Sequence, residues 1–264
     1  MLRRHFAIVV CTGLTVLFSA GLAVAYPSAV ILAPSGRVLP RGELDGFALA
    51  STELNGPRDS SSWFGANVGL WSGLGGDSHT FALEAGLDFV LRNAADVAPV
   101  TPLLNLKLSV AAERDPYPAL ALGVFELSPY GEANADLIYF AASKLLGDGG
   151  GFGDVTTGAL FSAAPPSFVS PCARGCAFRG SVPLEDTRWG GFLGWTSPKL
   201  GPLQFAFDAV TGSSLVSGAN AALTYALARQ LHAFSGASIA LDRRAVVAPA
   251  DSVSVGIAWS LGAQ

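Results

Sequence analysis

Alternation of apolar and polar side chains over residues 81–92 is the feature that most constrains the fold of this chain. One parity carries Phe81, Leu83, Leu87, Phe89 and Leu91, and the other carries Glu84, Gly86, Asp88 and Arg92. Successive side chains of a β-strand point to opposite faces, so this period of two predicts a strand with one apolar face. The same alternation recurs at 102–112, 202–211 and 252–261. Long strands of this kind behind an export signal are typical of transmembrane β-barrels.

The first residues carry such an export signal. Basic residues at positions 3–5 precede an apolar run over 6–24, and Ala-Val-Ala at 23–25 places small residues at both key positions of a cleavage site. This pattern predicts a secretory signal peptide. We expect cleavage near Ala25, which leaves a mature chain of 239 residues (264 minus 25). The expected location is the cell outer membrane of a Gram-negative bacterium.

The composition is unusually apolar for a secreted soluble domain, with 50% hydrophobic and 14% charged residues and a mean hydropathy of +0.44. No mature segment approaches the roughly 18 to 20 continuous apolar residues of a spanning helix, which excludes an α-helical membrane protein. Closed strands are the remaining way to satisfy the backbone in lipid. The net charge of −4, with scattered basic residues, predicts no nucleic-acid partner. Outer-membrane lipid and lipopolysaccharide are the expected surroundings.

A pass along the chain predicts about twelve strands, although ten to fourteen also fit. The predicted strands are 45–54, 63–72, 80–92, 102–112, 118–128, 135–146, 151–163, 188–197, 202–211, 218–227, 231–242 and 252–261. Odd-numbered connections are mostly longer than even-numbered ones, as in bacterial barrels that alternate external loops with periplasmic turns. The predicted fold is therefore an all-β, antiparallel transmembrane β-barrel with both termini in the periplasm. Such a fold implies the barrel assembly machinery as a partner.

The predicted organisation is a signal peptide at 1–25, a lead-in at 26–44 and one barrel domain at 45–264. The lead-in lacks strong alternation and contains Pro27, Pro34 and Pro40, which places it outside the barrel wall. Both a periplasmic position and a position tucked into the lumen fit this pattern.

Polar side chains on the strand faces are candidates for lining the lumen. They are Glu84, Asp88, Asn105, Lys107, Gln204, Asp208, Asn220 and Thr224, with His232 as a further candidate. One interpretation is a water-filled pore, and the other is an interior plugged by side chains and paired charges. Small inward residues such as Gly86, Gly256 and Ala258 leave space and favour the pore. Because acids outnumber bases in this set, a pore should prefer cations weakly.

The aromatic residues fall into two groups. Trp189, Trp195, Tyr225 and Trp259 share the parity of apolar neighbours and predict belts at the membrane interfaces. Trp63 and Trp71 instead share the parity of Gly65, Asn67 and Gly69, so the sequence leaves open whether they cap the lumen or face lipid.

Two cysteines, Cys172 and Cys176, lie in the sequence P-C-A-R-G-C at the centre of the longest predicted loop. An oxidising compartment favours a small disulfide ring between them. A structural zinc site needs four Cys or His ligands, and His79 and His232 fall in other parts of the chain. We therefore expect a disulfide and neither a metal nor a cofactor.

The mature chain also lacks a catalytic pattern. A hydrolase would need a nucleophile and a nearby histidine, and neither His79 nor His232 has Ser, Asp or Glu partners at a known catalytic spacing. The sequence therefore predicts a protein that is not an enzyme.

Three stretches carry a family resemblance: A-P-S-G-R-V-L-P-R-G-E-L at 33–44, Y-P-A-L-A-L-G-V-F-E-L at 117–127 and Y-F-A-A-S-K-L-L at 139–146. They resemble the YjbH-like outer-membrane barrels associated with exopolysaccharide production. In that family a P-T-A-R-x-L-P-x-G-E lead-in precedes the barrel, and a P-A-L-A-x-G-V strand is followed by a V-A-S-K strand. The resemblance implies a part in surface-polysaccharide export, with export components as partners and no transferable catalytic residues.

Two functional hypotheses follow. The first is a porin-like, non-enzymatic outer-membrane barrel that acts in transport as a small passive pore or as an accessory to surface-polysaccharide export. The second is a plugged structural barrel whose extracellular loops bind a partner or a surface glycan.

Overall fold

A computed structural model describes residues 33–54, 60–73, 81–92, 101–127, 137–162, 189–211, 218–240 and 251–262. The expected signal peptide, His79 and the Cys172–Cys176 pair lie outside these residues, so the signal peptide and the disulfide stay predictions. Within these ranges, no helix is both long and apolar enough to cross a membrane.

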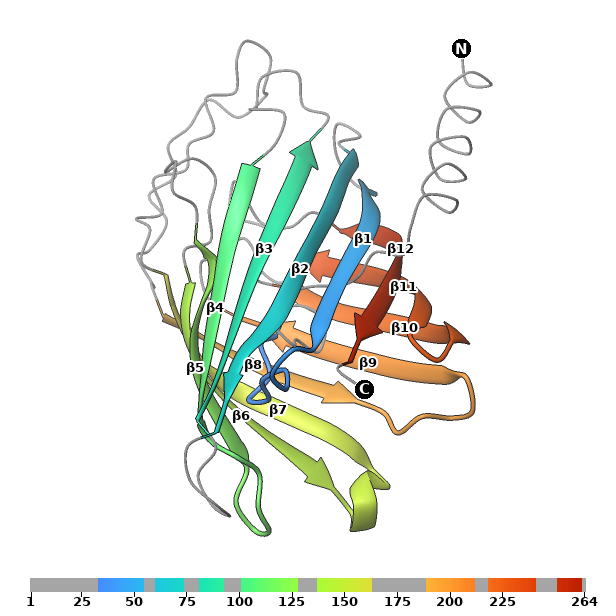
Figure 1. Cartoon of the computed structure of the whole chain (residues 1–264). Helices are drawn as coiled ribbons and strands as arrows, with labels where there is room; N and C mark the ends of the chain where they lie inside the picture. The colour runs from blue at the N-terminus through green and yellow to red at the C-terminus, as the bar shows by residue number, and fades with distance from the viewer. Residues whose placement is uncertain are drawn as a thin grey trace, which may run out of the picture.

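Twelve antiparallel strands close into one barrel (Figure 1). The strands are β1 (Leu44–Glu53), β2 (Ser60–Ser72), β3 (Ala82–Arg92), β4 (Thr101–Ala111), β5 (Ala119–Leu127), β6 (Leu137–Leu146), β7 (Gly153–Ser162), β8 (Trp189–Thr196), β9 (Leu203–Val210), β10 (Gly218–Ala228), β11 (Leu231–Ala240) and β12 (Ser252–Leu261). Each strand pairs with its neighbours in sequence, and β1 closes the ring against β12 along its whole length, from Leu44 opposite Leu261 to Glu53 opposite Ser252. The prediction of an all-β antiparallel barrel of twelve strands is confirmed, and every predicted strand end lies within three residues of the observed one.

The outer face of the barrel is apolar, as alternation predicts. In β3, Phe81, just before the strand, and Leu87 are exposed on the outside, whereas Glu84 and Asp88 are buried on the inside. Because strand alternation fixes the face of each side chain, the outer face is the one that contacts membrane lipid in a barrel of this kind.

Aromatic pairs lie on this outer face near both ends of the barrel. At the end with the longer connections, hereafter the loop end, Phe161 and Trp189 have ring centroids 4.9 Å apart. At the opposite end, hereafter the turn end, Trp195 and Phe207 have centroids 5.9 Å apart. Rings at both ends of an apolar band are the arrangement that anchors a protein at the two membrane interfaces.

A bulge in β2 resolves the orientation of its two tryptophans. The register between β2 and β3 shifts between Gly69 and Trp71, so Trp71 pairs with the outward-facing Leu83 and is exposed. Trp63 precedes the bulge, lies on the inner face and donates its Nε1–H to the Ser61 hydroxyl at 3.0 Å. One extra residue reverses the face of every later side chain in a strand, which parity along the sequence does not reveal.

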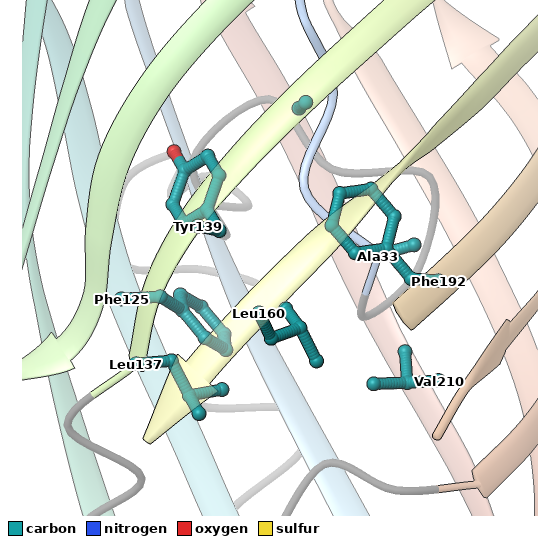
Figure 2. Close-up of a cluster of buried hydrophobic side chains, with 8 residues drawn as sticks. Ala33, Phe125, Leu137, Tyr139, Leu160, Phe192 and Val210 are labelled. Atoms are coloured by element: carbon teal, nitrogen blue, oxygen red, sulfur yellow. The ribbon is translucent and has the colours of Figure 1, made fainter. Parts of the chain in front are cut away.

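Strand β6 is apolar on both faces because its inner face packs into a hydrophobic core inside the barrel. Figure 2 shows this core next to the strap described below. Its members are Ala33, Phe125, Leu137, Tyr139, Ala141, Leu160, Phe192 and Val210, each at most 4% exposed. The barrel therefore contains a packed interior on the side of β5 to β9.

Residues 33–42, here called the strap, run inside the barrel before β1 begins. Ala33 belongs to the core, and the strap reaches the wall again where Gly42 N–H donates to Gly69 O at 2.8 Å. In Figure 1 the strap is the blue segment within the ring of strands, next to the start of β1. Of the two positions that the sequence left open for this part of the lead-in, the structure has the luminal one.

Candidate functional site in the barrel interior

The polar residues singled out from the sequence lie on the inner faces of their strands, but most of them are buried. Glu84, Asp88, Asn105, Lys107, Asp208 and Asn220 are all at most 5% exposed. Gln204 and Thr224, which face each other across β9 and β10, are half-buried. The interpretation that all eight line a water-filled lumen therefore needs correction for the six buried residues, which contact one another and the strap.

Strand register brings these buried groups together in pairs. Glu84 on β3 lies opposite Lys107 on β4, with Lys107 Nζ 3.9 Å from Glu84 Oε2. One row further along, Asn105 Nδ2 donates to Asp88 Oδ2 at 2.5 Å. Buried charged and polar groups are retained at tolerable cost only when they are paired in this way.

A second pair lies across the interior on β9 and β10. Asn220 Nδ2 donates to Asp208 Oδ1 at 2.6 Å, and the other carboxylate oxygen of Asp208 accepts the Ala33 N–H of the strap at 2.8 Å. Asp208 therefore links the wall to the start of the described strap.

The strap makes similar contacts at its other end. Leu39 N–H donates to Glu84 Oε2 at 2.9 Å, and Lys107 Nζ donates to the carbonyl of Arg37 at 2.8 Å. The strap is thus a partner for both members of the Glu84–Lys107 pair.

Between these points, Gly36 brings the strap against the wall. Its N–H donates to the Ser143 hydroxyl at 2.7 Å, and that hydroxyl in turn donates to Thr156 Oγ1 at 2.8 Å. A Cβ at position 36 would lie 2.5 Å from Ala119 O and 2.7 Å from Ser143 N, both backbone atoms. Only glycine fits this close approach.

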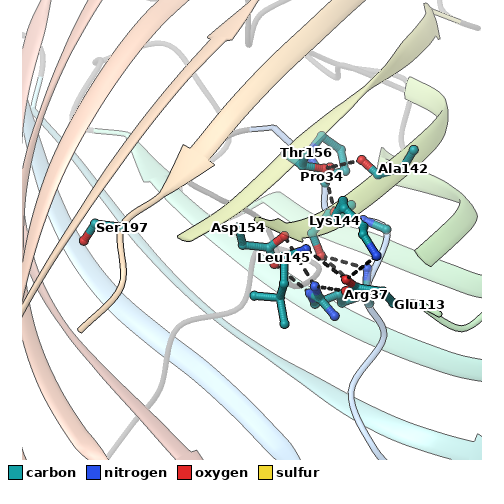
Figure 3. Close-up of polar contacts among 12 residues, drawn as sticks. Pro34, Arg37, Glu113, Ala142, Lys144, Leu145, Asp154, Thr156 and Ser197 are labelled. Atoms are coloured by element: carbon teal, nitrogen blue, oxygen red, sulfur yellow. Dashed lines mark hydrogen bonds and ion pairs between the residues drawn. The ribbon is translucent and has the colours of Figure 1, made fainter. Parts of the chain in front are cut away.

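At the turn end of the barrel, four charged residues hold the strap, and we call them the clasp: Arg37, Glu113, Lys144 and Asp154 (Figure 3). Arg37 Nε donates to Asp154 Oδ2 at 2.6 Å, and Arg37 Nη2 donates to Glu113 Oε2. Glu113 also accepts the Leu145 N–H at 3.0 Å and pairs with Lys144 at 3.3 Å. The guanidinium thus joins the connection after β4 to the start of β7.

The clasp is expected to weaken in acid. Partial burial raises the pKa of Glu113, but the hydrogen bonds from Arg37 and Leu145 and the charge of Arg37 outweigh this, so its pKa lies below the usual range. A lowered pKa stabilises the seated strap above the usual glutamate pKa, and this contribution is lost as pH falls through the lowered value. Between pH about 5 and about 3, the wild type should lose roughly 1 kcal/mol more stability than Glu113→Gln. Thermal unfolding of both proteins across this range checks the prediction, and equal losses would contradict it.

On β11 and β12, the opposite part of the wall, inner side chains are half-buried rather than buried. These residues are His232, Phe234, Gly236, Ser238, Ser252, Ser254, Gly256, Ala258 and Ser260. They are mostly small and uncharged, and the described strap makes no hydrogen bond to them that the structure records. We call these inner faces the open sector, and the inner faces of β3 to β9 with the strap the packed sector.

The glycines that favoured a pore divide between the two sectors. At Gly86 a Cβ would collide with Asn67 Oδ1, so the Asn67 side chain already occupies that space in the packed sector. At Gly256 a Cβ would lie 2.5 Å from Phe234 Cζ, because the phenylalanine ring lies against the glycine backbone. The expectation that Gly86 and Gly256 leave free space is therefore wrong.

The clasp residues and Ser143 were not identified from the sequence. Glu113 lies in a connection and Lys144 near a strand end, where alternation carries no information about long-range partners. The available signal was Arg37, one of two arginines, with Arg41, in the proline-containing lead-in, a segment that lumen acids could hold.

Comparisons with known proteins give little further information. No family model matches the chain, and no curated protein matches it. One solved structure that matches is outer membrane phospholipase A from Escherichia coli, at 12% sequence identity and a TM-score of 0.46, over 83% of this chain and 92% of that chain.

This match corrects one expectation. The matched protein is by its name an enzyme, which contradicts the expectation that the present chain is not an enzyme, and we withdraw that expectation. At this identity and TM-score the likeness assigns neither an activity nor a site to the chain.

Proposed function

We propose that this protein is an outer-membrane barrel that passes small solutes along the open sector while the strap fills the rest of the lumen. The observation that carries the proposal is the asymmetry of the interior. Inner side chains of β11 and β12 are half-buried and, apart from His232 and Phe234, small, whereas those of β3 to β9 are mostly buried against the strap and one another. A barrel interior lined by small neutral side chains sets an upper size for a solute but selects little by charge.

The proposed setting is the outer membrane of a Gram-negative bacterium, reached after cleavage near Ala25 and insertion by the barrel assembly machinery. The turn end, with the clasp, would then face the periplasm, and lipopolysaccharide would surround the loop end. The closed barrel with its apolar outer face and aromatic pairs at both ends supports this setting.

Planar-bilayer recording tests the pore. The wild type should give stable single-channel steps, and Ser254→Trp should reduce their size because residue 254 faces the open sector opposite Gly236 and Ser51. Val255→Trp is the matched control, since Val255 lies on the same strand, faces outward and is 62% exposed. An electrically silent but correctly folded wild type would contradict the pore and favour the plugged barrel.

A second candidate function is an accessory role in surface-polysaccharide export. The observation in its favour is that residues 33–44, which carry one part of the resemblance to YjbH-like barrels, include the whole strap and its contacts with Glu84 and Asp208. A segment with that many wall contacts would be a working part of the barrel in such proteins. Affinity purification from outer membranes tests this role: recovery of polysaccharide-export components supports it, and their absence from a preparation rich in folded barrel contradicts it.

A further inference from the structure

The strap neutralises an acidic interior. Among inner-face side chains that the structure describes, the acids are Asp45, Glu84, Asp88, Asp154 and Asp208, and the one lysine or arginine is Lys107. An excess of carboxylates inside a barrel is unfavourable unless donors or cations compensate it.

Three of these five acids receive a donor from the strap. Asp208 accepts the Ala33 N–H, and Glu84 accepts the Leu39 N–H. Asp154 accepts the Arg37 guanidinium. The three donors lie at residues 33, 37 and 39 of one short segment. They therefore reach acids on three strands, β9, β7 and β3. Beside Asp208, the side-chain oxygen of Asn220 is buried and has no hydrogen-bond partner.

The strap is not itself part of the wall. Apart from a single β-bridge at Pro34, the backbone hydrogen bond that the structure records from the strap to a strand is at Gly42, and the other recorded contacts of the strap with the wall involve side chains. Its single described ionic anchor, Arg37, lies about one-third exposed at the turn end, where water reaches it. Segments with few backbone ladder contacts and partly exposed anchors are the ones that open at low free energy.

We propose that the strap is a releasable gate, and that its release uncovers Glu84, Asp154 and Asp208 as a wall that selects cations. This inference rests on the proposed pore for its closed state, in which conduction is confined to the open sector. In the released state the passage is wider, and Glu84, Asp154 and Asp208 have lost the donors that the strap supplied. The permeant class of the released state is therefore small cations.

Charge reversal at the clasp is the direct test. Arg37→Glu places a third carboxylate beside Glu113 and Asp154 and should release the strap, with a severalfold rise in single-channel conductance in potassium chloride. Under a salt gradient the reversal potential should move toward that of the cation. Arg41→Glu is the matched control, because it makes the same charge change on the strap at an exposed position. It should leave conductance and selectivity at the wild-type level.

A compensating variant separates release from misfolding. Arg37→Glu combined with Glu113→Lys and Asp154→Lys restores opposite charges across the clasp and should return conductance toward the wild type. Arg37→Gln serves as the milder variant where the reversal yields too little folded barrel. Neutralising a wall acid in the released background, as Arg37→Glu with Asp208→Asn, should move the reversal potential back toward zero.

The outcomes distinguish this inference from the proposed pore. If Arg37→Glu, Arg37→Gln and Arg41→Glu all have the same conductance, the strap is not a gate. The proposed pore is not affected by that result. A silent wild type with conducting Arg37→Glu overturns the open-sector pore and supports the gate. Increased conductance without a dependence of the reversal potential on Asp208 overturns the cation-selective wall.

Discussion

Replacing Lys107 with methionine is expected to lower the free energy of unfolding by about 3 to 5 kcal/mol. Lys107 is fully buried, and Lys107 Nζ lies 3.9 Å from Glu84 Oε2 and 2.8 Å from the carbonyl oxygen of Arg37. Methionine keeps most of the side-chain volume but leaves the Glu84 carboxylate buried beside a neutral group. Urea or thermal unfolding of the barrel in lipid vesicles, followed by tryptophan fluorescence, measures the loss.

The matched control is the double variant Lys107→Met with Glu84→Gln. The amide keeps an acceptor for the Leu39 N–H but removes the uncompensated charge, so the double variant should be more stable than Lys107→Met alone. If both proteins lose the same stability, the Glu84–Lys107 pair is not the cause of the effect.

Adding a methyl group at position 36, by Gly36→Ala, is expected to displace the strap from the barrel wall. In Gly36→Ala the added Cβ would lie 2.5 Å from Ala119 O and 2.7 Å from Ser143 N. Backbone atoms of the wall cannot move aside as a flexible side chain can, so overpacking should cost the seated strap roughly 1 to 3 kcal/mol. The measurement is the rate of trypsin cleavage after Arg37 in the folded barrel, which should rise well above that of the wild type.

Gly191→Ala adds the same methyl group at a wall position where the nearest atom, Gly158 O, is 3.5 Å away. Its cleavage rate after Arg37 should match that of the wild type. If cleavage after Arg37 is as slow in Gly36→Ala as in Gly191→Ala, the close approach at position 36 does not determine whether the strap stays against the wall.

Alternation was sufficient to predict the fold because it depends on one local rule. Each strand with an apolar and a polar face was recognisable alone, and the bounds of β12, Ser252–Leu261, agree with the prediction at both ends. The rule failed where something non-local intervened. A bulge after Gly69 turned Trp71 outward, and a luminal core made the inner face of β6 as apolar as its outer face.

The candidate site was predictable only in part for the same reason. Parity placed Glu84 and Asp208 on the inner face, but their burial depends on the strap, whose path no local pattern encodes. Ser143 is a small polar residue among apolar neighbours, and its role appears only when the Gly36 N–H lies 2.7 Å from its hydroxyl. Long-range partners of this kind are 45 to 175 residues apart in the sequence and leave no periodic signal.

The division of the lumen into a packed and an open sector is tested most directly by thiol labelling of two inner-face positions. Ser143→Cys and Ser254→Cys would each be made in a background with Cys172 and Cys176 replaced by serine, and treated with a membrane-impermeant thiol reagent. Ser143 is 1% exposed beneath the strap, and Ser254 is half-buried in the open sector. In the folded barrel, labelling at position 254 should be rapid, and labelling at position 143 should occur only after unfolding or release of the strap. Equal labelling rates at the two positions in the folded protein would contradict the account.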